Sequence, residues 1–194
     1  VGKVELDIMR TVCECARRRF ENDLTGLEFK VFTPSGKIDI NGLEIQPMRV
    51  AHSVPDAYGF IIRTSSGTLV YTGDFRMHGY LVDATRLFME KAKEADVMIC
   101  EGTNMVRAEV ADESTVGATI RSLATKAKGL IVVDVSPLDV DRIVTIHDAT
   151  LKGDRSLVLN MRQACLLNSV AHSAEIAEMD IAKVPNVFVY EENA

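Results

Sequence analysis

The chain has 194 residues, of which 47% are hydrophobic and 26% charged, so it can bury a core as one domain or two small ones. Its formal net charge of -6 excludes binding of nucleic acid by bulk positive charge, so any such contact must be local. No run reaches the roughly 20 apolar residues of a membrane span, and the N-terminus lacks a signal-peptide pattern, so we expect a cytoplasmic protein with no membrane partner.

The first part of the chain predicts one helix followed by short strands. Residues 3–22 carry apolar side chains at helical spacing. From residue 27 onward, β-type runs alternate with turns and predict strands at 29–32, 37–40, 43–50, 59–64 and 68–72. This pattern is typical of an antiparallel meander.

After Gly79 the pattern alternates between helix and strand. Helices are expected over 84–94 and 113–127, from Pro137 onward, and over parts of 162–180; strands are expected at 97–101, 130–135, 157–159 and 187–190. Such alternation predicts an α/β region with parallel pairing. The four cysteines lack C-x-x-C spacing and predict reduced thiols, with Cys100 buried in an apolar run.

A histidine and an aspartate each follow a predicted strand. His52 comes after the strand at 43–50, and Asp74 comes after the strand at 68–72. Side chains at neighbouring strand ends are held rigidly and leave a coordination position open for water, as a hydrolytic metal centre requires. A structural role would also explain each residue, because a histidine after a strand and an aspartate in a turn often only stabilise the fold. Position alone therefore does not decide between a structural role and metal binding.

The sequence around these two residues is more specific. His52 begins the stretch H-S-V-P-D-A-Y-G, and Asp74 lies in T-G-D-F. Together the two stretches resemble the third and fourth metal motifs of the metallo-β-lactamase fold as they occur in ribonuclease J-like proteins of the β-CASP family. The resemblance implies that His52 binds one zinc ion and that Asp74 bridges two.

Two further stretches are similar to motifs of the same family. The strand that ends at Glu101 resembles motif A, which implies that Glu101 orients the His52 imidazole; otherwise Glu101 caps a helix or faces solvent. Residues 129–143 resemble the start of the β-CASP insertion, which implies Ser136 and Arg142 as contacts for RNA phosphate. The alternative is that Ser136 or Asp139 caps the following helix and that Arg142 lies on the surface.

The resemblance implies an α/β fold. Part of a metallo-β-lactamase αββα sandwich would occupy residues 1–107, and the start of a β-CASP-type α/β domain would occupy 108–194, with a soft boundary. The family's H-x-H-x-D-H motif, which supplies most metal ligands, is absent from the sequence, whose histidines are His52, His78, His147 and His172. A catalytic zinc site needs about three protein ligands, so the chain carries only part of one.

We therefore expect the full-length protein to be a zinc-dependent hydrolase of RNA phosphodiester bonds, a ribonuclease J-like nuclease whose site is incomplete in this chain. One alternative is a non-catalytic scaffold or binding relative of the same fold. Another is a metallo-β-lactamase-fold hydrolase of a small ester or thioester. The sequence leaves open whether the protein forms a homo-oligomer.

Overall fold

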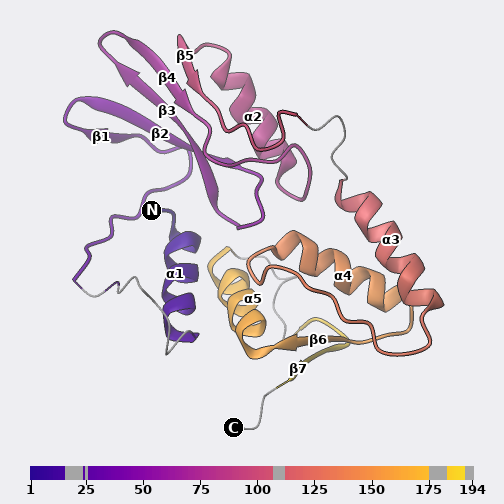
Figure 1. The fold of residues 1–194 in the computed structure, drawn as a ribbon. Coiled ribbons are helices and arrows are strands. Elements are labelled where there is room, and N and C mark those ends of the chain that lie inside the picture. The colour runs from indigo at the N-terminus through magenta and orange to yellow at the C-terminus, as the bar shows by residue number, and fades with distance from the viewer. Residues whose placement is uncertain (16–23, 25, 107–111, 175–182, 191–194) are drawn as a thin grey trace. The chain divides into compact units, whose positions relative to one another are not determined.

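The computed structural model describes residues 1–15, 24, 26–106, 112–174 and 183–190 (Figure 1). The chain divides into two compact units: the first comprises Val1–Glu5 and Phe29–Val110, and the second comprises Leu6–Glu28 and Ala111–Ala194. The division near residue 110 is close to the boundary expected at 107, whereas residues 6–28 group with the second unit. The assignment of the two parts to a metallo-β-lactamase-like and a β-CASP-like region stays a prediction.

The first unit is built on a five-stranded sheet in the order β1-β2-β3-β4-β5. Its strands are β1 (Ile38–Ile40), β2 (Leu43–Val50), β3 (Ala57–Thr64), β4 (Gly67–Tyr71) and β5 (Val97–Ile99). The first four strands pair antiparallel, and β5 joins β4 in parallel after helix α2 (Val82–Ala92). Because β2 and β4 both run antiparallel to β3, the strands β2, β4 and β5 all end at one edge of the sheet.

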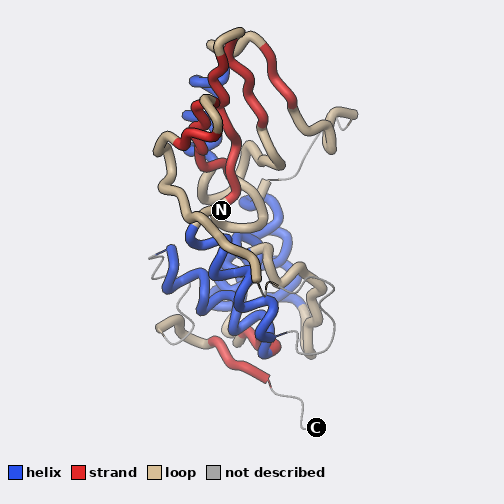
Figure 2. Tube along the Cα trace, turned by 90° about the vertical axis from the view of Figure 1, so that its left-hand side faces the viewer, coloured by secondary structure: helices blue, strands red, loops and turns tan. Residues whose placement is uncertain are grey.

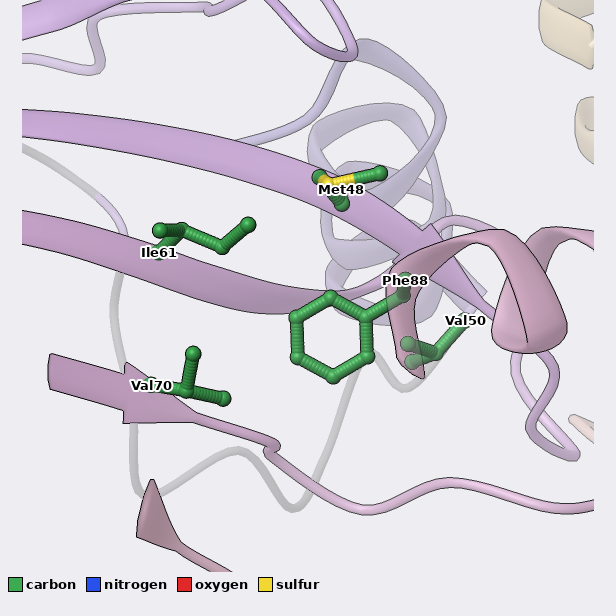
Figure 3. Close-up of a cluster of buried hydrophobic side chains, with 5 residues drawn as sticks. All are labelled: Met48, Val50, Ile61, Val70 and Phe88. Carbon is green, nitrogen blue, oxygen red and sulfur yellow. The ribbon is translucent and has the colours of Figure 1, made fainter. Parts of the chain in front are cut away.

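Helix α2 covers one face of this sheet. Its Phe88 is fully buried and packs against side chains from three strands, namely Met48, Val50, Ile61 and Val70 (Figure 3). Gly59 lies directly beneath the ring, because a Cβ atom at Gly59 would be only 2.8 Å from the Cε1 atom of Phe88. A glycine is therefore what lets the helix approach the sheet so closely.

The second face of the sheet is also apolar. Cross-strand partners share a face and form two rows there: Ile38, Ile45, Ile62, Leu69 and Val97 in one, and Pro47, Phe60, Tyr71 and Ile99 in the other. Val97 and Ile99 are 56% and 52% exposed. Strands that are apolar on both faces are typical of a sheet that lies between two covering layers.

The second unit is mainly helical (Figure 2). Its elements beyond residue 111 are α3 (Glu113–Lys126), α4 (Val140–Lys152), β6 (Leu157–Asn160), α5 (Met161–Ala174) and β7 (Val187–Tyr190). Strands β6 and β7 pair in parallel, as the alternating pattern predicts. Helix α1 (Lys3–Cys15) contributes its later turns to this unit, where the hydroxyl of Thr11 donates to that of Ser169 at 3.0 Å.

Two predicted strands are wrong. Residues 29–32 instead bond to the start of the chain, since the amino group of Val1 donates to the Lys30 carbonyl and the Phe32 N–H donates to the Val1 carbonyl. Residues 130–135 pair with no strand of the described structure, and Leu130 and Val132 are 90% and 84% exposed. Apolar residues with β propensity do not form a strand unless a neighbouring strand accepts their hydrogen bonds.

The remaining predicted elements are confirmed within the described residues, and β2 coincides with the expected 43–50. The ends expected for the first helix beyond residue 15, and for α5 beyond residue 174, lie outside the described residues. Cys100 is exposed, which corrects the prediction of a buried thiol; it follows β5, whose three residues are themselves exposed. Of the helices that the structure describes, none is both long and apolar enough to cross a bilayer.

Candidate metal centre

The backbone just before His52 is held on both sides. Ala51 follows β2, and its N–H donates to the Thr85 hydroxyl of α2 at 2.7 Å. The Ala51 carbonyl accepts the N–H of Arg76 at 2.6 Å. Both Ala51 and Thr85 are buried, so water does not compete for these bonds. These two hydrogen bonds thus hold the backbone that leads into His52 at the edge of the sheet.

The turn that carries Asp74 depends on its two preceding residues. Thr72 is fully buried, donates its N–H to the Ile99 carbonyl at 3.0 Å and accepts the N–H of Glu101 on its hydroxyl at 3.3 Å. Gly73 has φ = +57°, and a Cβ atom there would lie 2.8 Å from the Tyr58 carbonyl oxygen. Glycine alone can adopt this positive φ and also leave room for the Tyr58 carbonyl. The turn at Gly73 places Asp74 just beyond the end of β4, at the edge of the sheet.

Glu101 braces this turn. One carboxylate oxygen accepts the N–H of Phe75 at 3.1 Å, and the other accepts the N–H of Thr103 at 3.2 Å. Hydrogen bonds from the Thr103 hydroxyl and the Phe75 N–H, with a contribution from nearby His52, lower the pKa of the Glu101 carboxyl. Glu101 is therefore an anion at neutral pH, close to His52 and bonded to the residue after Asp74.

The side chains of His52 and Asp74 approach each other. The Nε2 atom of His52 lies 3.9 Å from the Oδ2 atom of Asp74. Two zinc ligands at about 2.0–2.2 Å from a tetrahedral ion would be separated by about 3.3–3.5 Å. The Asp74 side chain is 75% exposed, so it can rotate by the small amount that would close the difference. An imidazole nitrogen and a carboxylate oxygen fit zinc as part of a ligand set.

The ligand set is incomplete within the described residues. They contain no group of three histidine, cysteine, aspartate or glutamate side chains that could hold a metal ion. His147 and His172 hydrogen-bond backbone carbonyls, those of Pro185 and Asn168. The described part of the chain therefore offers two candidate ligands and one bracing acid, short of the three ligands of a catalytic zinc site.

The two residues predicted to contact RNA phosphate lie in the second unit and already have protein partners. The hydroxyl of Ser136 accepts the N–H of Leu138 at 3.3 Å. Arg142 donates from Nη2 to Glu113 at 2.9 Å and from Nε to the same carboxylate at 3.1 Å, a two-point ion pair. Asp139 is the N-cap of α4, as the capping alternative predicted.

Sequence reasoning missed two residues that position the centre. Thr72 and Thr85 are completely buried, yet each has a hydroxyl that binds a backbone N–H near a predicted ligand. Thr72 is the first residue of the T-G-D stretch, so the sequence did contain a signal for its role. Thr85 had none, because nothing distinguishes it from other polar residues of an amphipathic helix.

No family model matches the chain. Among curated proteins it is similar to ribonuclease J of Sinorhizobium meliloti, with 25% identity over 150 residues, covering 74% of this chain and 27% of that protein. Ribonuclease J 2 of Streptococcus pyogenes is 30% identical over 138 residues, covering 68% and 25%. Ribonuclease J of Mycobacterium tuberculosis is 31% identical over 134 residues, covering 62% and 24%. The chain thus spans about a quarter of the length of these curated relatives.

A solved structure has a similar fold. It is the crystal structure of a protein of unknown function from Enterococcus faecalis V583, with a TM-score of 0.75 and 21% sequence identity. The match covers 100% of this chain and 46% of the other. At this identity the likeness shows the α/β fold alone.

Proposed function

Because this chain is a relative of the ribonuclease J proteins, within the metallo-β-lactamase β-CASP family, we propose that the full-length protein is a zinc-dependent nuclease that hydrolyses RNA phosphodiester bonds. The names of the relatives support RNA as the substrate. The observation that carries the proposal is the approach of the His52 imidazole and the Asp74 carboxylate at one edge of the sheet.

In this proposal His52 and Asp74 hold the metal. Bound zinc supplies a Lewis acid and makes a coordinated water more acidic. The chain's own residues contribute rigidity: the bonds from Ala51 to Thr85 and Arg76 fix the approach of His52, and Glu101 fixes the turn after Asp74. Ligands whose positions are set before the metal binds lose little freedom on binding, and neighbouring hydrogen bonds keep them oriented.

The remaining ligands would come from other parts of the full-length protein. The apolar second face of the sheet supports this idea, because in an αββα sandwich a second sheet packs against it. Val97 and Ile99, both about half exposed, would then become buried. We propose that the segment that covers this face also carries the missing metal ligands.

For the substrate, we propose that the N-terminal end of α4 and its neighbouring residues contact RNA phosphate. Ser136 precedes this helix and Arg142 lies in its first turn. Glu113 holds the Arg142 guanidinium in one orientation, and the donors not bonded to Glu113 can still reach a phosphate oxygen. Because the whole chain has a net charge of -6, such local contacts would have to provide the attraction.

A second candidate function is a non-catalytic binding or scaffold relative. The absence of any H-x-H sequence, together with the lack of a three-ligand group among the described residues, favours it. The two candidates differ in one measurable property: a nuclease must bind metal and cleave RNA, whereas a scaffold can bind RNA without cleaving it.

The test uses the full-length gene product and its variants His52→Ala and Asp74→Ala. His172→Ala and Asp83→Asn serve as matched controls, since both residues are exposed and lie outside the proposed centre. We expect the wild type to contain zinc and to cleave a labelled RNA. Each site variant should lose at least half of the zinc and slow cleavage by roughly 100-fold or more, while the controls keep both properties.

Zinc content that is unchanged in both site variants would remove His52 and Asp74 from the metal centre. A wild-type protein that binds RNA but neither holds zinc nor cleaves would identify the scaffold function instead. Elemental analysis and the cleavage assay therefore separate the two candidates.

A further inference from the structure

We propose that Asp56 is a positioning residue for His52, and that it acts by tying the loop between β2 and β3 to the first turn of helix α1. The inference rests on the proposed metal-binding role of His52. It concerns residues 51–56, a loop with His52 near one end and Asp56 at the other.

Asp56 makes an unusual number of contacts for a loop residue. Its Oδ2 atom accepts the N–H groups of Val4 at 3.0 Å and of Glu5 at 3.4 Å. Its Oδ1 atom accepts the Arg49 Nε–H at 3.1 Å and also the hydroxyl of Tyr58. Asp56 itself is only 5% exposed, and its bonds to the Val4 N–H and the Tyr58 hydroxyl are buried and so shielded from water.

These contacts make Asp56 the cap of a helix that is distant in sequence. Helix α1 begins at Lys3, and the first N–H groups of a helix have no partner inside it. A carboxylate usually satisfies them from the residue just before the helix. In this protein the cap comes from 52 residues farther along the chain, and it joins the start of α1 to the β2–β3 loop.

The residues around Asp56 leave space for its carboxylate and hold its partner Tyr58 in place. A side chain at Gly2 would overlap both Asp56 and Tyr58. Phe32 packs edge-on against the Tyr58 ring, with centroids 4.9 Å apart, and holds the phenol over Asp56. Burial, followed by the hydrogen bond to Asp56, raises the pKa of Tyr58, so its hydroxyl remains a donor throughout the physiological pH range.

The loop conformation depends on the same contacts. Asp56 has φ = +70°, a left-handed conformation that is costly for a residue with a side chain but tolerated best by aspartate and asparagine. Ala51 is fixed at the other end by Thr85 and Arg76. With both ends held, the loop has few alternative paths, and His52 keeps its direction toward Asp74.

Asp56 is unsuited to be a metal ligand itself. Both of its carboxylate oxygens already accept two hydrogen bonds each, and the group is buried. Within the stretch H-S-V-P-D, the histidine and the aspartate therefore have different tasks: the first would bind metal, and the second fixes the loop that presents it.

The experiment compares full-length wild type with Asp56→Ala, Asp56→Asn and the matched control Asp112→Ala, which removes a helix-capping aspartate from α3 in the other unit. Hydrogen exchange of the segment spanning residues 49–58 reports on the loop, competition with a chelator gives the zinc dissociation constant, and RNA cleavage gives kcat and KM separately. Asp56→Asn keeps the tolerated backbone conformation and one acceptor oxygen, so it is the conservative variant and remains usable should the alanine variant fail to fold.

We expect Asp56→Ala to speed exchange of residues 51–56, to weaken zinc binding about 10- to 100-fold and to lower kcat with little change in KM. Asp56→Asn should recover part of each loss, and Asp112→Ala should change none of them. A lower melting temperature with unchanged loop exchange and unchanged zinc affinity would overturn the inference. If the wild type binds no zinc, the proposed function fails, and loop exchange alone still decides whether Asp56 fixes the loop.

Discussion

Glu101 accepts a hydrogen bond from the backbone N–H of Phe75, the residue that directly follows Asp74. The acid at the end of β5 thus controls the turn at the end of β4, although 26 residues separate the two in sequence. The same carboxylate also accepts the N–H of Thr103 and so fixes the chain on its own side. One anion holds two adjacent strand ends together at the proposed metal centre.

Glu101→Gln is expected to weaken metal binding without unfolding the protein. The amide keeps one oxygen, but its NH2 group faces an N–H that it cannot accept, so either Phe75 or Thr103 loses its bond. We expect zinc affinity and RNA cleavage to fall about 10- to 100-fold. Titration of the full-length protein with a zinc-sensitive chelator measures the effect. Glu90→Gln, an exposed change on α2, is the control, and an equal loss in both variants would contradict a specific role for Glu101.

Gly59→Ala tests the close approach of α2 to the sheet. The added methyl group would overlap the ring of Phe88, which is fully buried and has no space to move into. Overpacking of this kind costs about 1–3 kcal/mol. Gly129→Ala is the control, because a Cβ atom there meets no atom within 4 Å. Denaturant unfolding of the two variants should show a loss for Gly59→Ala only.

Arg142 can contact RNA, support the fold, or do both, and two variants separate these roles. If Arg142 binds a phosphate, Arg142→Ala should reduce the slope of log affinity against log salt by about one. Glu113→Gln removes the ionic partner of Arg142 and should cost about 1–3 kcal/mol of stability, while the positive charge of Arg142 and with it the wild-type salt slope are kept. An Arg142→Ala protein that is less stable but keeps the wild-type salt slope would make Arg142 purely structural.

Asp112 provides a pH-dependent test of the second unit. It caps α3, and hydrogen bonds from the N–H of Thr115 and the hydroxyl of Ser114 lower its pKa from 3.8 to about 2. A lowered pKa in the folded state means that the cap stabilises α3 above pH 3.8 and that this contribution is lost as the pH falls through 2. The melting temperatures of wild type and Asp112→Ala should therefore differ at pH 6, and the difference should shrink as the pH falls from 3.8 through 2. A difference at pH 2 as large as that at pH 6 would contradict the assignment.

The sequence was most informative where structure depends on nearby residues. The strand at 43–50 and the cap at Asp139 were expected from local patterns, and so was the position of His52, Asp74 and Glu101 after strands. The family resemblance then assigned those three residues to one site. Local spacing could not have done so, because it does not determine which strands are neighbours.

The contacts that sequence reasoning missed join residues far apart in the chain. Thr85 bonds to Ala51 across 34 residues, and Asp56 bonds to Val4 across 52. Residues 130–135 failed as a strand for a related reason, since strand formation requires a partner that local propensity does not reveal. Each of these features depends on how distant segments meet, and that information is not contained in a short sequence window.

The parallel pairing of β4 with β5 has an evolutionary consequence. The connection through α2 returns the chain to the same edge of the sheet, whatever its length. Residues can be inserted or removed between α2 and β5, at the exposed turn before Asp96, while the ends of both strands stay adjacent. A change of length in this connection would therefore leave Asp74 and Glu101 just beyond the ends of two adjacent strands.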